Sequence, residues 1–303
     1  MGHDYHTGEV EAQTRAGVRD IALKLAKATH ASIPPIAQQF LEAQVMVVLA
    51  TMDREGEVWA SLVTGQPGFA RATAPATIEI EGRVAGGDPL PQNLEANQAC
   101  GMIAVEFSSR RRMRANGRAT LIDGRIVLEA REIYSNCPRY IQERHCTGVQ
   151  ATTGVSATRR GKALTPSQIA WVSQADTFFI ATTEPETGAD ASHKGGYPGF
   201  VQVDTAETLL FPDYNGNCMF NTIGNIARNP KAGLLFLDFD TGAALQLTGR
   251  TEVLWEDPLI STFPGAERLV RFDIDGVIET PAASLLSWQF DGYSRHLPGL
   301  PKK

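Results

Sequence analysis

Two stretches of this chain repeat one another at a separation of 131 residues. Residues 60–70 read ASLVTGQPGFA and residues 191–201 read ASHKGGYPGFV, and six of the eleven positions are identical. Unrelated segments are expected to agree at about one position. Further along, the separation becomes 132, because Gly117-Arg118 aligns with Gly249-Arg250. A period of this length is too long for a solenoid and predicts two whole domains related by an approximate two-fold axis.

Each copy shows the same order of predicted elements. A proline begins a short helix at about 35–43 and again at about 166–174, since proline suits the first helical turn. Apolar runs and turns with glycine and proline follow, which favours small barrels over a doubly wound parallel sheet. We expect a helical arm at 1–33, a first barrel at 34–150, a linker at 151–164, a second barrel at 165–257 and a tail at 258–303 that packs on the barrels.

The composition is that of a globular protein. Apolar residues make up 43% of the 303 residues and no run of 18 apolar residues occurs, so we expect a packed core and no membrane span. The net charge of -6 argues against a nucleic-acid partner. The polar start of the chain lacks the apolar region of a signal peptide, which indicates a cytoplasmic location. Four cysteines without CxxC spacing and six scattered histidines predict neither a disulfide framework nor a metal site.

The second copy is polar at a point where the first copy is apolar. His193-Lys194 replaces a Leu-Val pair, beside two glycines that let a ligand approach the backbone closely. Asn221 or Thr222 would cap a short helix, and the N-terminus of that helix could hold a phosphate. Considered one at a time, Asn221 is explained as a cap of its own helix and Lys194 as a solvated side chain. Their joint occurrence in one of two related copies favours a ligand site there.

The first copy carries an arginine-rich run of its own. Arg110, Arg112 and Arg114 alternate along a predicted strand, so they would share one face. In a two-fold pair of barrels, this face could reach a ligand held by the other copy. A solvated basic strand accounts for the run equally well, and the sequence leaves both interpretations open.

A resemblance to a known family rests on four segments: SHKGGYPGFV (192–201), PDYNGNCMFNTIGN (212–225), NPKAGLLFLDF (229–239) and LQLTGR (245–250). They resemble the FMN-binding split-barrel superfamily of pyridoxamine 5′-phosphate oxidases, in particular its tandem flavin-nucleotide-binding branch. The resemblance implies a mainly β fold with flanking helices, in which two six-stranded Greek-key split barrels form an internal pseudo-dimer with FMN at the seam. It also implies an oxidoreductase that transfers hydride or electrons between a small substrate and an acceptor through the flavin.

The resemblance assigns the cofactor site to the second copy. The FMN phosphate would meet Asn221 and Thr222, with Lys194 nearby, and a cation such as Lys194 or His193 would stabilise reduced, anionic flavin. The other expected contacts are the ring platform Pro198, Gly199, Phe200 and Val201, then Asn217, Phe220, Asn225 and Gln246, and lastly Arg112 and Arg114 from the first copy. The namesake oxidase has an Arg-x-His motif near its end, whereas this chain has an uninterrupted Arg295-His296. Oxidation of vitamin B6 phosphates is therefore not implied.

Other functions stay open at the level of the sequence. The barrels could hold FMN without turnover, or haem with His193 or His145 as the axial ligand. Both sites could also have decayed in a structural protein. The sequence identifies no catalytic residue, and it leaves open the substrate or electron donor, the acceptor, and whether two tandem chains pair as a homodimer.

Overall fold

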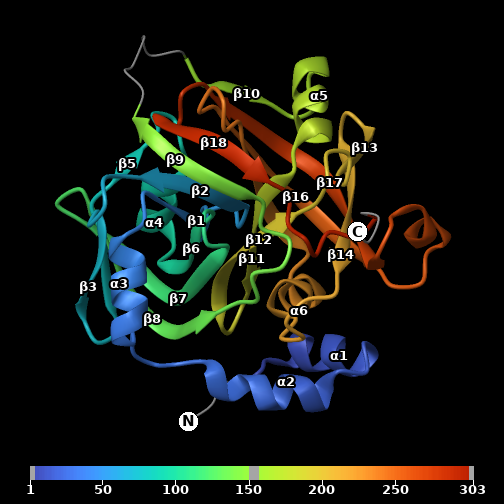
Figure 1. The fold of residues 1–303 in the computed structure, drawn as a ribbon, viewed down its shortest axis with the longest axis horizontal. Coiled ribbons are helices and arrows are strands. Elements are labelled where there is room, and N and C mark those ends of the chain that lie inside the picture. Colours follow the sequence, from blue (N-terminus) through green and yellow to red (C-terminus); the bar gives the residue numbers. More distant parts are fainter. Residues whose placement is uncertain (1–3, 150–156, 300–303) are drawn as a thin grey trace.

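The computed structural model describes residues 4–149 and 157–299, and two antiparallel sheets dominate it (Figure 1). The first sheet contains β1 (Met46–Met52), β2 (Val58–Thr64), β3 (Ala70–Ala74), β4 (Thr77–Ile80), β5 (Arg83–Val84), β6 (Ala99–Glu106), β7 (Arg111–Ile122) and β8 (Arg125–Ser135). The second contains β10 (Arg159–Gly161), β11 (Thr177–Glu184), β12 (Gly188–Gly195), β13 (Gln202–Thr205), β14 (Thr208–Tyr214), β15 (Lys231–Leu237), β16 (Ala244–Leu254) and β17 (Ala266–Thr280). A separate pair joins β9 (Glu143–Val149) to β18 (Leu286–Gly292).

Short helices flank the sheets. They are α1 (Thr7–Arg15), α2 (Arg19–Leu25), α3 (Pro35–Glu42), α4 (Leu90–Ala96), α5 (Pro166–Gln174) and α6 (Asn221–Arg228), with 3₁₀ turns η1 (Ala26–Ala28) and η2 (Pro258–Thr262). Helices α3 and α5 both begin at a proline, as the sequence predicts. None of the helices in the described residues is long and apolar enough to cross a membrane.

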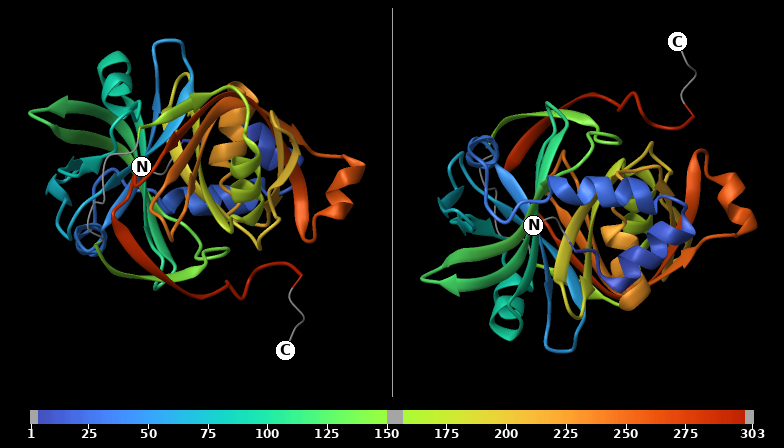
Figure 2. Two further views of the ribbon diagram at one scale, coloured as in Figure 1. Left: turned by 90° about the horizontal axis from the view of Figure 1, so that it is seen from above. Right: turned by 90° about the horizontal axis from the view of Figure 1, so that it is seen from below.

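Both sheets have the same strand order. The first runs β3-β4-β8-β7-β6-β1-β2, ending in β5, and the second runs β13-β14-β17-β16-β15-β11-β12, with β10 beside β17. Figure 2 shows the resulting barrels side by side, the first in blue to green and the second in yellow to orange. The predicted fold of two tandem split barrels in one chain is confirmed. Each sheet has eight strands rather than the expected six, and the additional ones include the short β5 and β10.

Equivalent hydrogen bonds recur in the two barrels. Asn93 Nδ2 donates to Thr51 Oγ1 over 3.0 Å, and Asn225 Nδ2 donates to Thr182 Oγ1 over 3.0 Å. These bonds tie α4 to β1 and α6 to β11, so each barrel holds its short helix in the same place. The amide of Gly199, like that of its counterpart in the first barrel, donates to the end of the helix that precedes the barrel.

Strands at the seam bury both faces. Along β1, Val47 and Leu49 point into the core of the first barrel, while Met46, Val48 and Ala50 pack against the second barrel. Strand β11 alternates in the same way, because Phe178 and Ile180 enter the second core and Phe179 and Ala181 the seam. Since alternate side chains of a strand face opposite sides, one apolar run serves two cores.

Two glycines set the distance between the barrels. A methyl group at Gly101 would lie 2.6 Å from the Ala189 carbonyl oxygen, and one at Gly233 would lie 2.5 Å from the Val58 carbonyl oxygen. Each contact is to backbone of the other barrel, which cannot rotate away as a flexible side chain can. At these two positions the sheets therefore approach one another more closely than any side chain larger than that of glycine would allow.

Two predicted boundaries change. Residues 159–161 of the predicted linker form β10 against β17, and its residues 151–156 lie outside the described residues. The predicted tail begins too early at 258, because β17 lies between β14 and β16 and satisfies the hydrogen bonds of both. The second barrel thus extends to 280. Beyond it, β18 pairs with β9 from the first half of the chain. The predicted helical arm contains α1 and α2, and α1 packs on α6 (Figure 1).

The seam glycines give a direct test of the pairing. Replacing Gly233 with Ala should lower the free energy of unfolding by about 1–3 kcal/mol, because the added methyl group overlaps backbone of the other barrel. Urea denaturation measures the difference. Gly86→Ala is the control, since a methyl group there meets no atom within 4 Å. Equal stability of the two variants would contradict the close approach.

Candidate functional site

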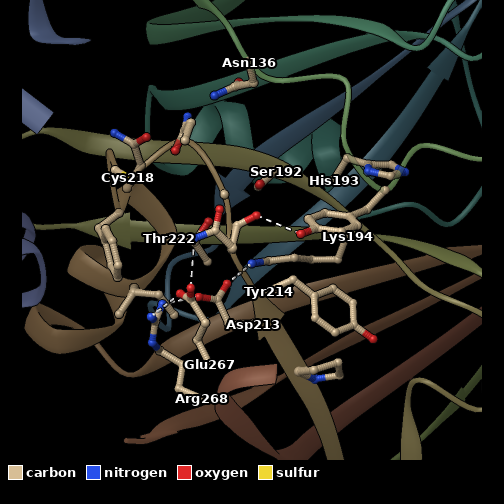
Figure 3. A pocket seen from close by; sticks show the side chains of 18 of the residues that line it. Asn136, Ser192, His193, Lys194, Asp213, Tyr214, Cys218, Thr222, Glu267 and Arg268 are labelled. Atoms are coloured by element: carbon tan, nitrogen blue, oxygen red, sulfur yellow. Dashed lines mark hydrogen bonds and ion pairs between the residues drawn. The ribbon is translucent and has the colours of Figure 1, made fainter. Parts of the chain in front are cut away.

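A cavity of about 240 Å³ opens between the barrels, on the second-barrel side of the seam. Its walls come from the end of β12, the β14 end with the loop at 212–218, the start of α6, and β17. Strand β7 contributes from the first barrel, and Ala16 and Val18 contribute from the N-terminal arm. Figure 3 shows that the labelled polar side chains converge on this space from several elements.

Nine of the fourteen residues expected at the cofactor site line this cavity. They are Arg112, Arg114, His193, Lys194, Phe200, Asn217, Phe220, Asn221 and Thr222. Strand β7 therefore does reach the second copy, as one of the two interpretations of the arginine run held. Arg110 does not share that face, since it sits in a turn at φ 56° before β7 and pairs with Glu143 at 2.8 Å.

The remaining five expected residues lie elsewhere. Pro198 and Gly199 are exposed in a turn, because the positive φ of Gly199 (89°) reverses the chain there. Val201 is buried in the core of the second barrel. Asn225 lies one turn into α6, where its side chain bonds Thr182 and His6 at 3.0 Å each. The predicted ring platform of four residues is thus reduced to Phe200.

Gln246 faces the first barrel instead. Its Nε2 donates to the Ala60 carbonyl at 2.9 Å and to Asp88 Oδ2 at 3.0 Å. The reason is the pseudo-two-fold arrangement: β7 reaches the second barrel's site, so its counterpart β16 reaches the equivalent place in the first. Gln246 therefore lies at the equivalent place in the first barrel and not at the cavity, where its cofactor contact was expected.

The start of α6 is held in an unusual conformation. The N-cap is Phe220, at φ 64°, and no side chain caps the helix, so the predicted capping role of Asn221 or Thr222 is wrong. Asn221 Nδ2 donates instead to Glu9 Oε1 of α1 at 2.6 Å. Cys218, two residues earlier, also has positive φ (60°). Non-glycine residues in this region are strained, and such strain is commonly found at binding sites.

Lys194 belongs to a chain of alternating charges on the cavity wall. It lies 2.7 Å from Asp213, which lies 2.5 Å from Arg268, and Arg268 also contacts Glu267 at 2.7 Å. The two cations lower the pKa of Asp213 despite its burial, so this carboxylate is ionised at neutral pH. No sequence pattern indicated Asp213, Glu267 or Arg268 as site residues, although Asp213 lies within a segment that carries the family resemblance.

Arg114 is fixed by a buried network that crosses the seam. It donates to Asp190 Oδ2 at 3.0 Å and also contacts the Ser192 hydroxyl. Tyr134 and Asn116 donate to the same carboxylate, at 2.9 Å and 3.0 Å. Among the described residues, the side-chain partners of the Asp190 carboxylate all come from the first barrel, and this carboxylate holds the Arg114 guanidinium at the cavity.

Arg112 differs from the other cations of the cavity. Its Nη1 donates to the His193 carbonyl at 3.4 Å, and no carboxylate of the described residues pairs with it. Burial and the neighbouring Arg114 lower the pKa of Arg112 to about 9, which leaves it charged at neutral pH. A positive charge without a counter-ion in a half-buried position favours an anionic ligand.

His193 is neutral rather than cationic. Burial and the nearby Arg112 lower its pKa well below the ordinary value. Its ring packs edge-on against Phe107 and Phe179, at centroid distances of 6.3 Å and 5.7 Å. Of the two residues expected as a cation beside the flavin, neutral His193 does not fit that role, which leaves Lys194.

Unsatisfied polar atoms gather around this cavity. Buried atoms without a hydrogen-bond partner in the described residues include both ring nitrogens of His193, both amide atoms of Asn136, and the Nε atoms of Arg112, Arg114 and Arg268. All five residues line the cavity. Most of these atoms are donors, and buried polar groups in native proteins nearly always have partners. The cavity is thus suited to an oxygen-rich, negatively charged ligand.

The equivalent place in the first barrel contains a carboxylate. Asp88 Oδ1 accepts from the Leu90 amide at 2.8 Å, at the start of α4, while Gln246 donates to Oδ2. Burial raises the pKa of Asp88 to about 6. Gln246 also contacts the Ser61 hydroxyl at 3.3 Å, just as Arg114 contacts that of Ser192. In the first barrel, therefore, a carboxylate of the chain itself meets the start of the helix and the counterpart of Arg114.

The raised pKa of Asp88 predicts how stability depends on pH. Between its ordinary value of 3.8 and the folded value of about 6, the folded chain binds a proton that the unfolded chain has lost. Stability therefore falls over this range as pH rises, by about 3 kcal/mol from this group. Asp88→Asn should gain that amount relative to the unmodified chain between pH 4 and pH 7.

Urea denaturation across that pH range measures the effect. Asp123→Asn, at an exposed turn, is the control and should differ from the unmodified chain by a constant amount. If the difference between Asp88→Asn and the unmodified chain does not change with pH, the carboxyl is not held in the environment described.

Comparison with known proteins gives one family match. Residues 164–284 match the family model described as Pyridoxamine 5'-phosphate oxidase. A candidate pyridoxamine 5'-phosphate oxidase from Lactobacillus delbrueckii is 20% identical, over 39% of this chain and 94% of its own, with a TM-score of 0.33. A FAD-binding protein from Mesorhizobium loti is 16% identical, over 42% of this chain and 99% of its own, with a TM-score of 0.29.

A search among curated proteins found no match to this chain. Structural similarities at such low identity and TM-score carry no argument about function. The likeness to a known family therefore rests on the family-model match alone. The matched residues span the second barrel, including β17 and all of the cavity wall that this barrel supplies. Residues 164–284 of this chain are thus similar in sequence to the pyridoxamine 5'-phosphate oxidase family.

Proposed function

We propose that the cavity binds flavin mononucleotide and that the chain is a flavin-dependent oxidoreductase acting between a small substrate and an acceptor. The observation that supports this most is the group of buried, unpartnered donors around the cavity. A flavin mononucleotide offers a phosphate, ribityl hydroxyls and the two carbonyls of its ring. These oxygens can accept hydrogen bonds from the unpartnered donors. The cavity is close to the lower end of the usual range for small-molecule sites, which is about 300–1,000 Å³.

The residues present fit the parts of this cofactor. The phosphate would be held by the start of α6 with Thr222, and by the cations Lys194 and Arg112. A helix N-terminus and a nearby cation both favour an anion. Phe200 and Phe220 supply apolar surface for the ring. When bound, the flavin would supply hydride or electron transfer, which needs no nucleophile from the protein.

The chain's own contribution is electrostatic and positional. Arg112 and Lys194 make the cavity favourable to negative charge, and Asp190 keeps Arg114 in a single orientation. Neutral His193 can donate or accept one hydrogen bond at the wall, because both ring nitrogens lack a partner in the described residues. Pairing of two tandem chains and a cytoplasmic location stay predictions.

Haem binding without turnover is not favoured. His145 is exposed, contacts Asp291 and lies outside the cavity. His193 is confined between Phe107 and Phe179, so its ring presents an edge to the aromatic cluster. The absorption spectrum of the purified chain tests both functions, since bound flavin gives a yellow chromophore and haem gives a Soret band. Photometric assays with NADH and NADPH then test for turnover.

Arg112 offers the sharpest test of the cofactor site. Arg112→Gln should weaken binding of flavin mononucleotide by about 10- to 100-fold, because a charge-assisted hydrogen bond is lost. Titration followed by flavin fluorescence measures the affinity. Arg111→Gln is the matched control, since Arg111 is the adjacent residue of β7 but is exposed and pairs with Glu106. Equal affinity of the two variants would remove Arg112 from the site.

The proposed phosphate contacts make a second prediction. The chain should bind flavin mononucleotide at least about tenfold more tightly than riboflavin, which lacks the phosphate. Lys194→Met should reduce this preference by weakening the mononucleotide and leaving riboflavin nearly unchanged. Competition titrations of both flavins against both proteins decide the matter. A preference that survives in Lys194→Met would place the phosphate elsewhere.

A further inference from the structure

A larger hollow, of about 600 Å³, lies on another side of the second barrel. It is bounded by α5, the start of β11, the turn between β15 and β16, and β18. None of the residues that line it lines the cavity between the barrels. We call this hollow the aromatic groove, because its walls include Trp171, Phe239, Trp288, Phe290 and Tyr293.

The walls of the aromatic groove are partly open to solvent. Phe290 and Tyr293 are 46% and 38% exposed, although they pack on one another at a centroid distance of 4.9 Å. Phe239 and Trp288 meet edge to face at 5.8 Å on the inner side. Aromatic faces at a concave and accessible place favour a planar ring, which gains both burial and stacking there.

The floor of the groove carries donors without an acceptor. Arg144 is only 7% exposed and uses one side of its guanidinium for Asp176, at 2.6 Å. Its other terminal nitrogen, Nη1, has no partner in the described residues, and neither does the hydroxyl of Thr177, which is 2% exposed. Both residues line the groove. Two buried groups of this kind indicate a ligand with an oxygen acceptor.

The rim carries acceptors. Asp238 and Asp240, in the turn between β15 and β16, line the groove and have no ion-pair partner in the described part of the chain. Asp238 Oδ1 already accepts two backbone amides of its own turn, which fixes this carboxylate in place. The rim therefore favours a donor and repels an anion, while the charge of Arg144 at the floor is balanced by Asp176.

We propose that the aromatic groove is a second ligand site, and that it takes a neutral planar aromatic amide. A carboxamide has a carbonyl oxygen for Arg144 and Thr177 and an NH₂ group for the rim carboxylates. Because the Arg144 guanidinium lies over the rings of Phe239 and Phe290, at 4.2 Å and 5.2 Å, the ligand's ring packs against the other aromatic walls, Trp171, Trp288 and Tyr293. The aromatic acid with the same ring is repelled by the rim carboxylates, and the corresponding amine offers no acceptor to Arg144 and Thr177. This site does not depend on the flavin.

Three small probes share a pyridine ring and differ in the group attached to it, so they test which group the aromatic groove selects. Nicotinamide should bind the full-length chain at least about tenfold more tightly than nicotinate or protonated 3-picolylamine. Ligand-observed NMR titrations give the three affinities. Equal affinity for the three probes, or no binding of nicotinamide at millimolar concentration, would overturn the proposal.

Variants locate the binding. Thr177→Val should weaken nicotinamide by about fivefold or more, because the hydroxyl is lost at nearly constant volume, and Thr177→Ser should restore it. Trp171→Ala removes a wall and should weaken binding further, with Trp255→Ala, outside the groove, as its control. Nicotinamide binding that is lost in Arg112→Gln but kept in Thr177→Val and Trp171→Ala would belong to the cavity instead, and would overturn the proposal.

Discussion

The close contact of the two barrels at their seam is the constraint on which the rest of the structure depends. Strands such as β1 and β11 bury one face in their own barrel and the other against the partner barrel, so neither sheet could be covered alone. Gly101 and Gly233 permit an approach that a single methyl group would prevent. This approach carries β7 across to the second barrel, which puts Arg112 and Arg114 at the cavity on that barrel's side of the seam.

One architecture has produced two different sites. In the first barrel, Gln246 and the Leu90 amide satisfy the Asp88 carboxylate, so the polar groups there have partners within the chain. In the second, Arg114 takes the place of Gln246, and the start of α6 has no side-chain cap. The two sites therefore differ in charge: the first contains its own anion at the helix start, whereas in the second Arg112 and several buried donors have no partner among the described residues.

The sequence predicted two like barrels, because the repeat covers most of each, and it left open whether the arginines of β7 cross to the second barrel or face solvent. It could not place Gln246, because the alignment shows which residues are equivalent but not which barrel each of them faces. The sequence did not indicate Arg268, because β17 follows η2 and two prolines, a pattern typical of an irregular tail. Only the pairing of β17 with β14 brings Arg268 to Asp213, and such non-local contacts leave no pattern in the sequence.

Buried charges at the seam are difficult to explain by stability alone. Replacing a buried ion pair by apolar residues is often neutral or stabilising, because taking two charges out of water costs about as much as their attraction returns. The first barrel shows that a less charged solution folds in the same architecture, since Leu62 and Val63 stand where the second has His193 and Lys194. Packing alone therefore does not account for the arginines and Lys194, which is consistent with the ligand site proposed above. A ligand that carries acceptors and negative charge would satisfy the donors they leave free, and it would offset the unpaired charge of Arg112.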